Sequence, residues 1–413
     1  MEEPERAGAA APSSRAGTAL DLLRLGFRCT MSASPPPSPG FGTWRCDEAL
    51  LEEAVLAALR LGYRHLDCAQ LYKNERIVGR AIARALAEGA PATRAELFVT
   101  GKLAPTQMQA ESVRPAIERS LADLFPEAHA AHAADPAAHA APYFDLFITH
   151  WPYSVDPACT TSPAPFAMRR GYSPAAYLAV WRAMEAAHDA GLVRALGCSN
   201  MTAKKLHALI EGAAAVGAAA PAAPAAPAVP AAPAGGADDR ARVRPSCVQV
   251  ELHPFLAQRS LLDYCAARGI AVTGYCPLGS PGRPALYRAP GDPDVLAAAP
   301  VAAAAAAHAC SPAQVLLRWA VQRGTVPLPR STNAGRIAEN LAGARGSGSG
   351  SGAPAGEWRL SEAEVAAIDA LDAGSEMGRI MKGDNFAREG EHWREVWDVD
   401  WVATPAPAGR AVT

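Results

Sequence analysis

The 413-residue sequence contains no CxxC pair, and its nine cysteines are scattered from Cys29 to Cys310. An odd number of dispersed cysteines argues against a disulfide framework or a zinc site and favours a reducing compartment. No apolar run approaches the roughly 18–20 residues of a membrane span. The formal net charge is only −2, which gives no sign of the basic surface that binds nucleic acid or anionic membranes. We therefore expect no partner of either kind.

Targeting signals are also lacking. The first residues, MEEPER, carry three acids and no apolar core segment, unlike a secretory signal or an Arg- and Ser-rich transit peptide. This start favours a cytoplasmic location, with import into an organelle left open.

Several tracts are dominated by Ala, Pro, Ser and Gly, and they hold too little bulky apolar surface to offset the entropy lost on ordering. We predict a disordered N-terminal extension at 1–37 and disordered insertions at about 127–142, 212–244 and 345–356. His129, His132 and His139 lie in the first insertion, but a flexible Ala-rich loop does not fix metal ligands. We expect no metal site.

Outside these tracts, short β-prone runs alternate with longer amphipathic runs. The strand candidates are 39–43, 63–67, 97–101, 144–149, 193–198, 247–251, 270–275 and 325–329. The helix candidates are 47–62, 113–124, 174–192, 257–269 and 311–324. Most of these runs end at or beside a Gly, and the last begins with an N-cap serine followed by proline, as helices commonly do.

Strands that each precede a helical run predict parallel pairing, and a closed barrel hides every strand edge. We therefore predict an α/β protein with a (β/α)8 TIM barrel and low-complexity insertions. An open doubly wound sheet is the alternative, but no GxGxxG follows the first strand, and GFGTWR at 40–45 has the wrong spacing. The insertions at 127–142 and 212–244 each follow a helix and precede a strand, which places them at the end of the barrel opposite the active site.

Four reactive side chains follow predicted strands at the end of the barrel where active sites lie. They are Asp67 and Tyr72 after the second strand, Lys102 after the third and His150 after the fourth. A buried ammonium lowers the pKa of a nearby phenol, and a carboxylate keeps that ammonium charged. An imidazole can orient a substrate oxygen. Together they predict a device that protonates a developing alkoxide, with the hydride coming from a nicotinamide cofactor.

A second cluster follows the eighth strand and consists of Arg330, Ser331, Thr332 and Arg336, which we call the late loop. Loops after the seventh and eighth strands of such barrels often bind phosphate. Two guanidinium groups suit a phosphate monoester, so the late loop is a predicted phosphate site.

The chain resembles the aldo-keto reductase superfamily, in particular its aldose and aldehyde reductases. The matching segments occur in the family's order and are GFGTW (40–44), GYRHLDCAQLYKNERIVGRAI (62–82), LFVTGKL (97–103), DLFITHWP (145–152), GLVRALGCSN (191–200), VQVELHP (248–254), GYCPLG (274–279) and LPRSTNAGRIAEN (328–340). The resemblance implies a (β/α)8 barrel that binds NADPH without a Rossmann domain. It also implies carbonyl reduction by the tetrad Asp67, Tyr72, Lys102 and His150, with Tyr72 as the general acid.

The resemblance also assigns residues to parts of the cofactor. Ser199, Asn200 and Gln249 would contact the nicotinamide carboxamide. Tyr275 would stack on the nicotinamide ring, and Leu278 would lie along the pyrophosphate.

At the adenine end, the late loop would hold the 2′-phosphate, with Glu339 and Asn340 on the adenine side. Thr43 and Trp44 would line the nicotinamide end. The implied substrate pocket consists of Trp44, Tyr72, His150 and Trp151. Arg330 stands where the family usually has Lys, which keeps the charge and changes the geometry.

The resemblance divides the chain into the extension at 1–37, the barrel at 38–375, and a C-terminal segment at 376–413. The C-terminal segment would close over the substrate and set specificity. These features predict a monomeric, NADPH-dependent enzyme that reduces the carbonyl of an aldehyde, an open-chain sugar or a ketone. A catalytically idle NADPH-binding interaction protein on the same barrel is the alternative, although all four tetrad positions are filled.

Overall fold

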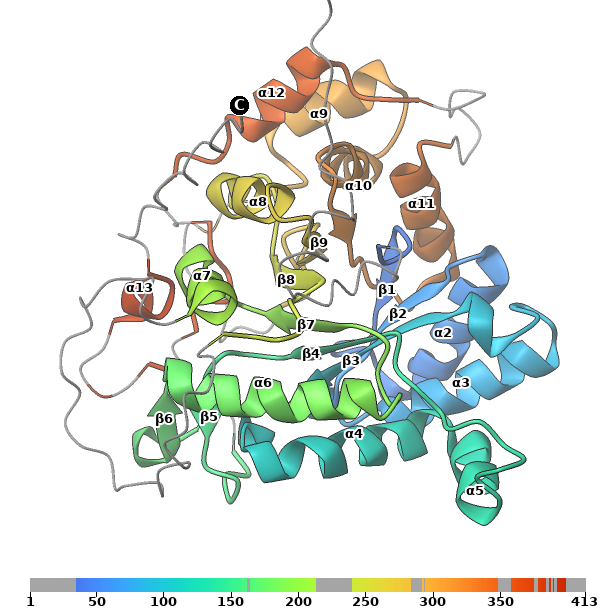
Figure 1. Cartoon of the computed structure of the whole chain (residues 1–413). Helices are drawn as coiled ribbons and strands as arrows, with labels where there is room; N and C mark the ends of the chain where they lie inside the picture. The colour runs from blue at the N-terminus through green and yellow to red at the C-terminus, as the bar shows by residue number, and fades with distance from the viewer. Residues whose placement is uncertain are drawn as a thin grey trace, which may run out of the picture.

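The computed structural model describes residues 35–161, 164–212, 240–283, 292, 294–347, 358–374, 378–383, 386–387, 389 and 392–398. Eight parallel strands form a nearly closed barrel in the order β1-β2-β3-β4-β7-β8-β9-β10 (Figure 1). They are β1 Gly40–Gly42, β2 His65–Asp67, β3 Phe98–Leu103, β4 Leu146–Thr149, β7 Leu196–Ser199, β8 Cys247–Glu251, β9 Ala271–Tyr275 and β10 Val326–Pro327. The backbone N–H of Gly42 donates to the carbonyl oxygen of Pro329 at 3.0 Å and joins the two ends of the sheet. The predicted (β/α)8 barrel is confirmed.

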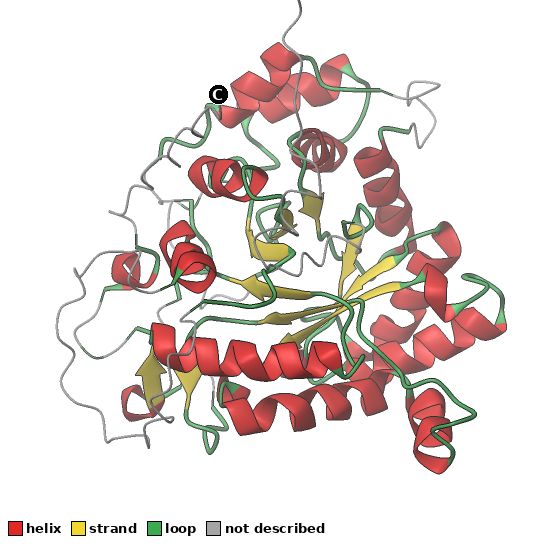
Figure 2. Ribbon diagram, in the orientation of Figure 1, coloured by secondary structure: helices red, strands yellow, loops and turns green. Residues whose placement is uncertain are grey.

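The helices lie outside the ring of strands (Figure 2). Those that follow barrel strands are α2 Glu48–Leu61, α3 Glu75–Ala87, α4 Ala110–Leu124, α6 Pro174–Asp189, α7 Ala203–Glu211, α8 Arg259–Ala266, α10 Pro312–Gln322 and α11 Ala334–Arg345. The remaining helices are α5 Pro126–Ala134, α9 Ala299–Ala307, α12 Glu362–Asp369 and α13 Trp393–Val396, with short 3-10 turns η1 Gln70–Tyr72, η2 Arg94–Glu96, η3 Pro105–Gln107 and η4 Phe166–Met168. The main apolar core fills the space between the strands and these helices.

Helix boundaries follow the capping signals in the sequence. The Asp47 side chain accepts a hydrogen bond from the amide of Ala49 at the start of α2, and Gly62 ends that helix with φ of 102°. Ser311 and Gln314 form a capping box at the start of α10, and a proline follows Ser311 in the first turn of the helix. Such caps satisfy amides that have no partner within the helix.

The segment 127–142 differs from its prediction as a disordered insertion, because Pro126–Ala134 forms helix α5. None of the α5 residues is buried, so the helix does not rest on core packing. Alanine has the highest helix propensity and proline suits the first helical turn, which explains an ordered helix in an Ala-rich tract. The predicted disordered segments 1–37, 212–244 and 345–356 lie largely outside the described residues.

A short antiparallel pair outside the barrel was not predicted. Strands β5 Ser154–Val155 and β6 Arg169–Gly171 form it within the long connection after β4. Two-residue and three-residue strands leave almost no periodic signal in a sequence.

No single helix among the described residues is long and apolar enough to cross a membrane. Helices α9 and α10 taken together have the length and composition of a membrane span, but the pair is bent by 97°.

Replacing Gly79 with Ala should destabilise the barrel, because α3 and α4 touch through backbone atoms at this glycine. A Cβ at position 79 would lie 2.6 Å from the carbonyl oxygen of Asp123 and 2.9 Å from that of Leu124. Overpacking of this kind costs about 1–3 kcal/mol of the free energy of unfolding, measurable by urea titration. Ala83→Ser on the exposed face of the same helix is the control. An equal effect of the two changes would contradict the expectation.

Candidate active site

The predicted tetrad is assembled at the carboxyl ends of β2, β3 and β4. The Lys102 Nζ donates to Asp67 Oδ2 at 2.6 Å, to the carbonyl oxygen of Cys68 at 2.9 Å and to the Tyr72 hydroxyl at 3.2 Å. The Lys102 side chain is 0% exposed, so these three acceptors take the place of solvent around its Nζ. The Tyr72 and His150 rings meet edge to face with centroids 5.4 Å apart. The structure therefore brings all four side chains together.

A single connection places both Asp67 and Tyr72. Strand β2 ends on Asp67, and η1 turns the chain immediately afterwards. The amide of Tyr72 donates to the carbonyl oxygen of Ala69 at 3.0 Å, and Lys73 follows in the left-handed region with φ of 57°. This tight turn sends the phenol back towards the barrel axis, where the strand end has already placed the carboxylate.

Burial keeps the phenol and the imidazole of the site uncharged. It raises the pKa of Tyr72 well above its ordinary value, and the Asp67 carboxylate raises it further. Burial also lowers the pKa of His150 well below its ordinary value, and the Lys102 ammonium adds to that effect. The net effect on Tyr72 is therefore a raised pKa, set by burial and the Asp67 carboxylate, whereas the sequence indicated only the lowering effect of the ammonium. Tyr72 carries its proton and can donate it.

Gln249 also contacts the tetrad. Its Nε2 donates to Asp67 Oδ1 at 2.8 Å, so the two carboxylate oxygens of Asp67 are held separately by Gln249 and Lys102. This contact was not expected, because the family resemblance assigned Gln249 to the cofactor. A hydrogen bond across the barrel interior cannot be read from strand periodicity, which gives the face of a residue and not its partner.

A cavity of about 450 Å³ opens above the tetrad. Its lining includes most of the predicted site residues, namely Trp44, Asp67, Tyr72, His150, Trp151, Ser199, Asn200, Gln249, Tyr275, Leu278, Arg330, Ser331, Thr332, Arg336, Glu339 and Asn340. Lys102 is not part of the lining, but its Nζ contacts Asp67 and Tyr72, which are. Thr43 does not line the cavity, since it is fully buried and its hydroxyl donates to the carbonyl oxygen of Asp67 at 2.8 Å. Thr43 therefore supports the end of β2.

The middle of the cavity is built from polar groups that hold one another. The Tyr275 hydroxyl donates to Asn200 Oδ1 at 2.7 Å, and Asn200 Nδ2 donates to the carbonyl oxygen of His150 at 2.9 Å. The backbone of Asn200 is in the left-handed region with φ of 59°, a conformation that asparagine tolerates better than most residues. These bonds fix the turn after β7 against β4 and β9.

The cavity is also lined by cations. Both arginines of the late loop line it, and the Arg336 Nε donates to Ser331 Oγ at 3.4 Å. The Asn333 side chain caps the start of α11 by accepting from the amide of Arg336. The late loop thus combines two guanidinium groups with a helix N-terminus, a combination that suits a phosphate.

The cavity also has an apolar wall, to which Trp44, Trp151 and Met381 contribute. The Trp151 ring packs on Phe386 at 4.5 Å and on Trp397 at 5.7 Å between centroids, so the described part of the C-terminal segment supports this wall.

Sequence reasoning missed several lining residues, which are Gly42, Pro277, Ser280, Pro281, Gly282, Leu296, Ala313, Leu328, Pro329 and Met381. Those at 277–282 directly follow β9, so their place after a barrel strand was a usable signal. Met381 belongs to the C-terminal segment that was predicted to cover the substrate, but nothing in that irregular segment singled out this residue.

Comparisons with known proteins agree with this geometry. A model of the Aldo/keto reductase family matches residues 39–129 and 140–372. The gap between the two matched ranges covers the end of α5 and the residues that follow it. Aldo-keto reductase family 1 member A1 of Rattus norvegicus is 36% identical over 305 residues, which cover 74% of this chain and 80% of that protein. Aldo/keto reductase slr0942 of Synechocystis is 33% identical over 364 residues, which cover 88% of this chain and 93% of that protein. The chain belongs to the aldo/keto reductase family of oxidoreductases.

Proposed function

We propose that this protein uses NADPH to reduce the carbonyl of an aldehyde to an alcohol, with open-chain sugars and ketones as further candidate substrates. The proposal rests on one observation above all. The protonated Tyr72 hydroxyl, 3.2 Å from a fully buried ammonium, lines the same cavity as the two arginines of the late loop. Purified protein should therefore consume NADPH when an aldehyde is added. Tight NADPH binding without turnover on a broad carbonyl panel would instead favour an idle binding protein.

The residues present fit this cofactor in their chemistry. The late loop would hold the 2′-phosphate, with Glu339 and Asn340 on the adenine side, and Leu278 would lie along the pyrophosphate. Ser199, Asn200 and Tyr275 would hold and stack the nicotinamide. When bound, the nicotinamide supplies the hydride that no side chain can provide.

The chain's own residues would manage the proton and the position of the carbonyl. His150 is uncharged and lines the cavity, so a ring nitrogen that carries a proton can act as a neutral donor to the substrate oxygen. Tyr72 would hold the transferable proton on its hydroxyl. Lys102 would stabilise the phenolate that remains after transfer, and Asp67 would balance the charge of Lys102. The apolar wall of Trp44 and Trp151 would exclude water from the reacting carbonyl.

Arg330→Ala should weaken NADPH binding selectively. A charge-assisted hydrogen bond to the 2′-phosphate would be lost, which corresponds to an increase in the Kd for NADPH of about tenfold to a hundredfold. The Kd for NADH should stay unchanged, because NADH lacks that phosphate. Both constants can be measured by quenching of tryptophan fluorescence. Arg345→Ala is the matched control, since Arg345 lies on α11 outside the cavity and donates to Gly62. Equal losses for the two cofactors would rule out the assigned role.

A further inference from the structure

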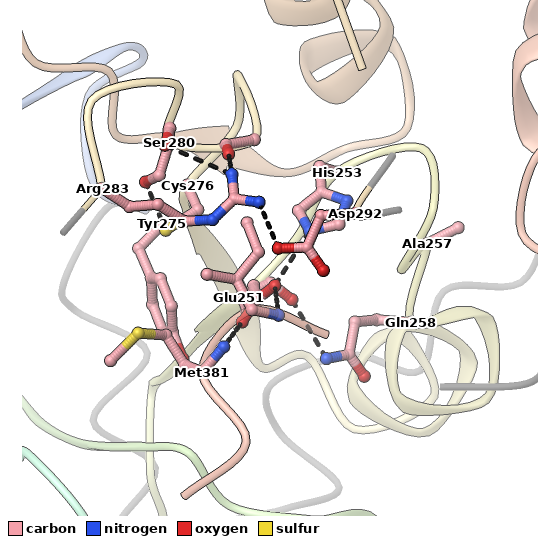
Figure 3. A network of polar contacts seen from close by, with 12 residues as sticks. Glu251, His253, Ala257, Gln258, Tyr275, Cys276, Ser280, Arg283, Asp292 and Met381 are labelled. Atoms are coloured by element: carbon pink, nitrogen blue, oxygen red, sulfur yellow. Dashed lines mark hydrogen bonds and ion pairs between the residues drawn. The ribbon is translucent and has the colours of Figure 1, made fainter. Parts of the chain in front are cut away.

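Glu251 ends β8 with a carboxylate inside the protein. The residue is 0% exposed, and its side chain accepts three hydrogen bonds (Figure 3). His253 Nε2 donates to Oε1 at 2.9 Å, the amide of Ile380 donates to Oε1 at 2.7 Å, and the amide of Met381 donates to Oε2 at 2.7 Å. Two of the three donors therefore belong to the backbone of a segment about 130 positions away in the chain.

The carboxylate is ionised in this setting. Burial alone would raise the pKa of Glu251, but His253, Arg379 and the amide of Ile380 outweigh burial and hold the pKa below its usual range. Charge-assisted hydrogen bonds to a buried carboxylate are among the stronger polar contacts in proteins. The anchor is therefore strong enough to fix the backbone of an irregular segment.

The anchored segment reaches the cavity directly. Met381 lines the cavity, and its own amide is held by Glu251. The same strand carries Gln249 two positions earlier, which holds Asp67. Alternate residues of a strand point to the same face, so from one face of β8 Gln249 contacts the tetrad and Glu251, two positions later, contacts the C-terminal segment.

We propose that Glu251 is a positioning residue for substrate binding, which anchors residues 378–383 so that Met381 forms part of the substrate wall. Its effect on substrate rests on the proposed function, whereas the anchoring itself does not. Glu251 touches neither the tetrad nor the late loop in the described contacts. Its backbone pairs with Tyr275 of β9, and exchanging the carboxylate for an amide leaves that pairing in place. The side chain should therefore act on substrate affinity and leave the chemical step and NADPH binding alone.

Glu251→Gln tests the proposal. Glutamine keeps the shape but has one acceptor oxygen, so its NH2 group must face one of the three donors. With 4-nitrobenzaldehyde as the probe, the KM should rise about tenfold, the change that loss of one such bond produces. The kcat and the Kd for NADPH should stay unchanged. Met381→Ala should also raise the KM, and the double variant should be no worse than the more affected single variant, since both act through one contact.

Trypsin provides a readout that needs no turnover. Arg379 and Lys382 flank the anchored residues, so release of the segment should speed cleavage after them by about tenfold, the same factor as the lost bond. Mass spectrometry identifies the two cleavage sites.

Glu185→Gln is the matched control. Glu185 is 2% exposed and accepts from the amide of Val243 at 2.7 Å, remote from the cavity. It should alter neither the KM nor cleavage at the segment. If trypsin cleaves Glu251→Gln after Arg379 and Lys382 no faster than it cleaves Glu185→Gln, the anchoring proposal is wrong, whatever the activity of the wild-type protein. If the wild-type protein consumes no NADPH while the cleavage difference persists, the proposed function fails and the anchor stands.

Discussion

Tyr72→Phe should lower the kcat for aldehyde reduction by about 10²–10⁴-fold, the usual contribution of a general acid. The change removes one hydroxyl and leaves the ring, which packs edge to face on His150. Lys102 loses an acceptor at 3.2 Å and keeps Asp67 and the carbonyl oxygen of Cys68. Folding and NADPH affinity should therefore be preserved, so the loss will be confined to the chemical step.

The natural control for this variant is Tyr177→Phe. Tyr177 is also buried and its hydroxyl pairs with Thr149 Oγ1 at 2.7 Å, but it does not line the cavity. Steady-state assays of both variants, with NADPH titrated by fluorescence, separate loss of the proton donor from loss of a buried hydroxyl. Near wild-type turnover by Tyr72→Phe would exclude the proposed mechanism.

Lys102→Met should impair both stability and catalysis. It removes the ammonium that pairs with Asp67 at 2.6 Å, inside a site where the lysine side chain is 0% exposed. Breaking a buried ion pair from one side costs about 3–5 kcal/mol of the free energy of unfolding. Turnover should fall as far as in Tyr72→Phe or further, because nothing would then stabilise the phenolate left after proton transfer.

A second variant separates the two effects. Asp67→Asn combined with Lys102→Met removes both charges, so urea unfolding should show partial recovery of stability while NADPH consumption remains lost. Arg94→Met breaks an ion pair with Asp145 at 2.8 Å at the opposite end of the barrel. It should lower stability and leave kcat/KM unchanged. If Lys102→Met were as active as Arg94→Met, the lysine would have no role in the reaction.

The fold and the tetrad follow from local patterns in the sequence. Alternating β-prone and amphipathic runs predict the barrel, and polar residues directly after those runs, such as Asp67 and His150, mark the end of the barrel at which the four side chains meet. The fold and this grouping could be predicted because strand period and strand ends are local properties.

The features that the sequence analysis did not predict depend on contacts between segments that are distant in the chain. The bond from Gln249 to Asp67 spans 182 positions, and the anchoring of Met381 by Glu251 spans 130. The pKa of Tyr72 depends on how deeply the cavity buries it, which no local pattern records. Helix α5 was missed for a different reason, because an Ala-rich tract was taken as low complexity when its helix propensity was high.

The alternation along β8 limits how this strand can change in evolution. Inserting or deleting one residue between Gln249 and Glu251 would rotate one of the two side chains to the opposite face of the sheet. The tetrad would then lose its amide donor or the C-terminal segment would lose its anchor. A substitution in β8 changes one contact, whereas a change in the length of β8 moves a whole part of the strand to the opposite face. The connections that join helices back to strands, where α5 lies, carry no such restriction and are free to lengthen.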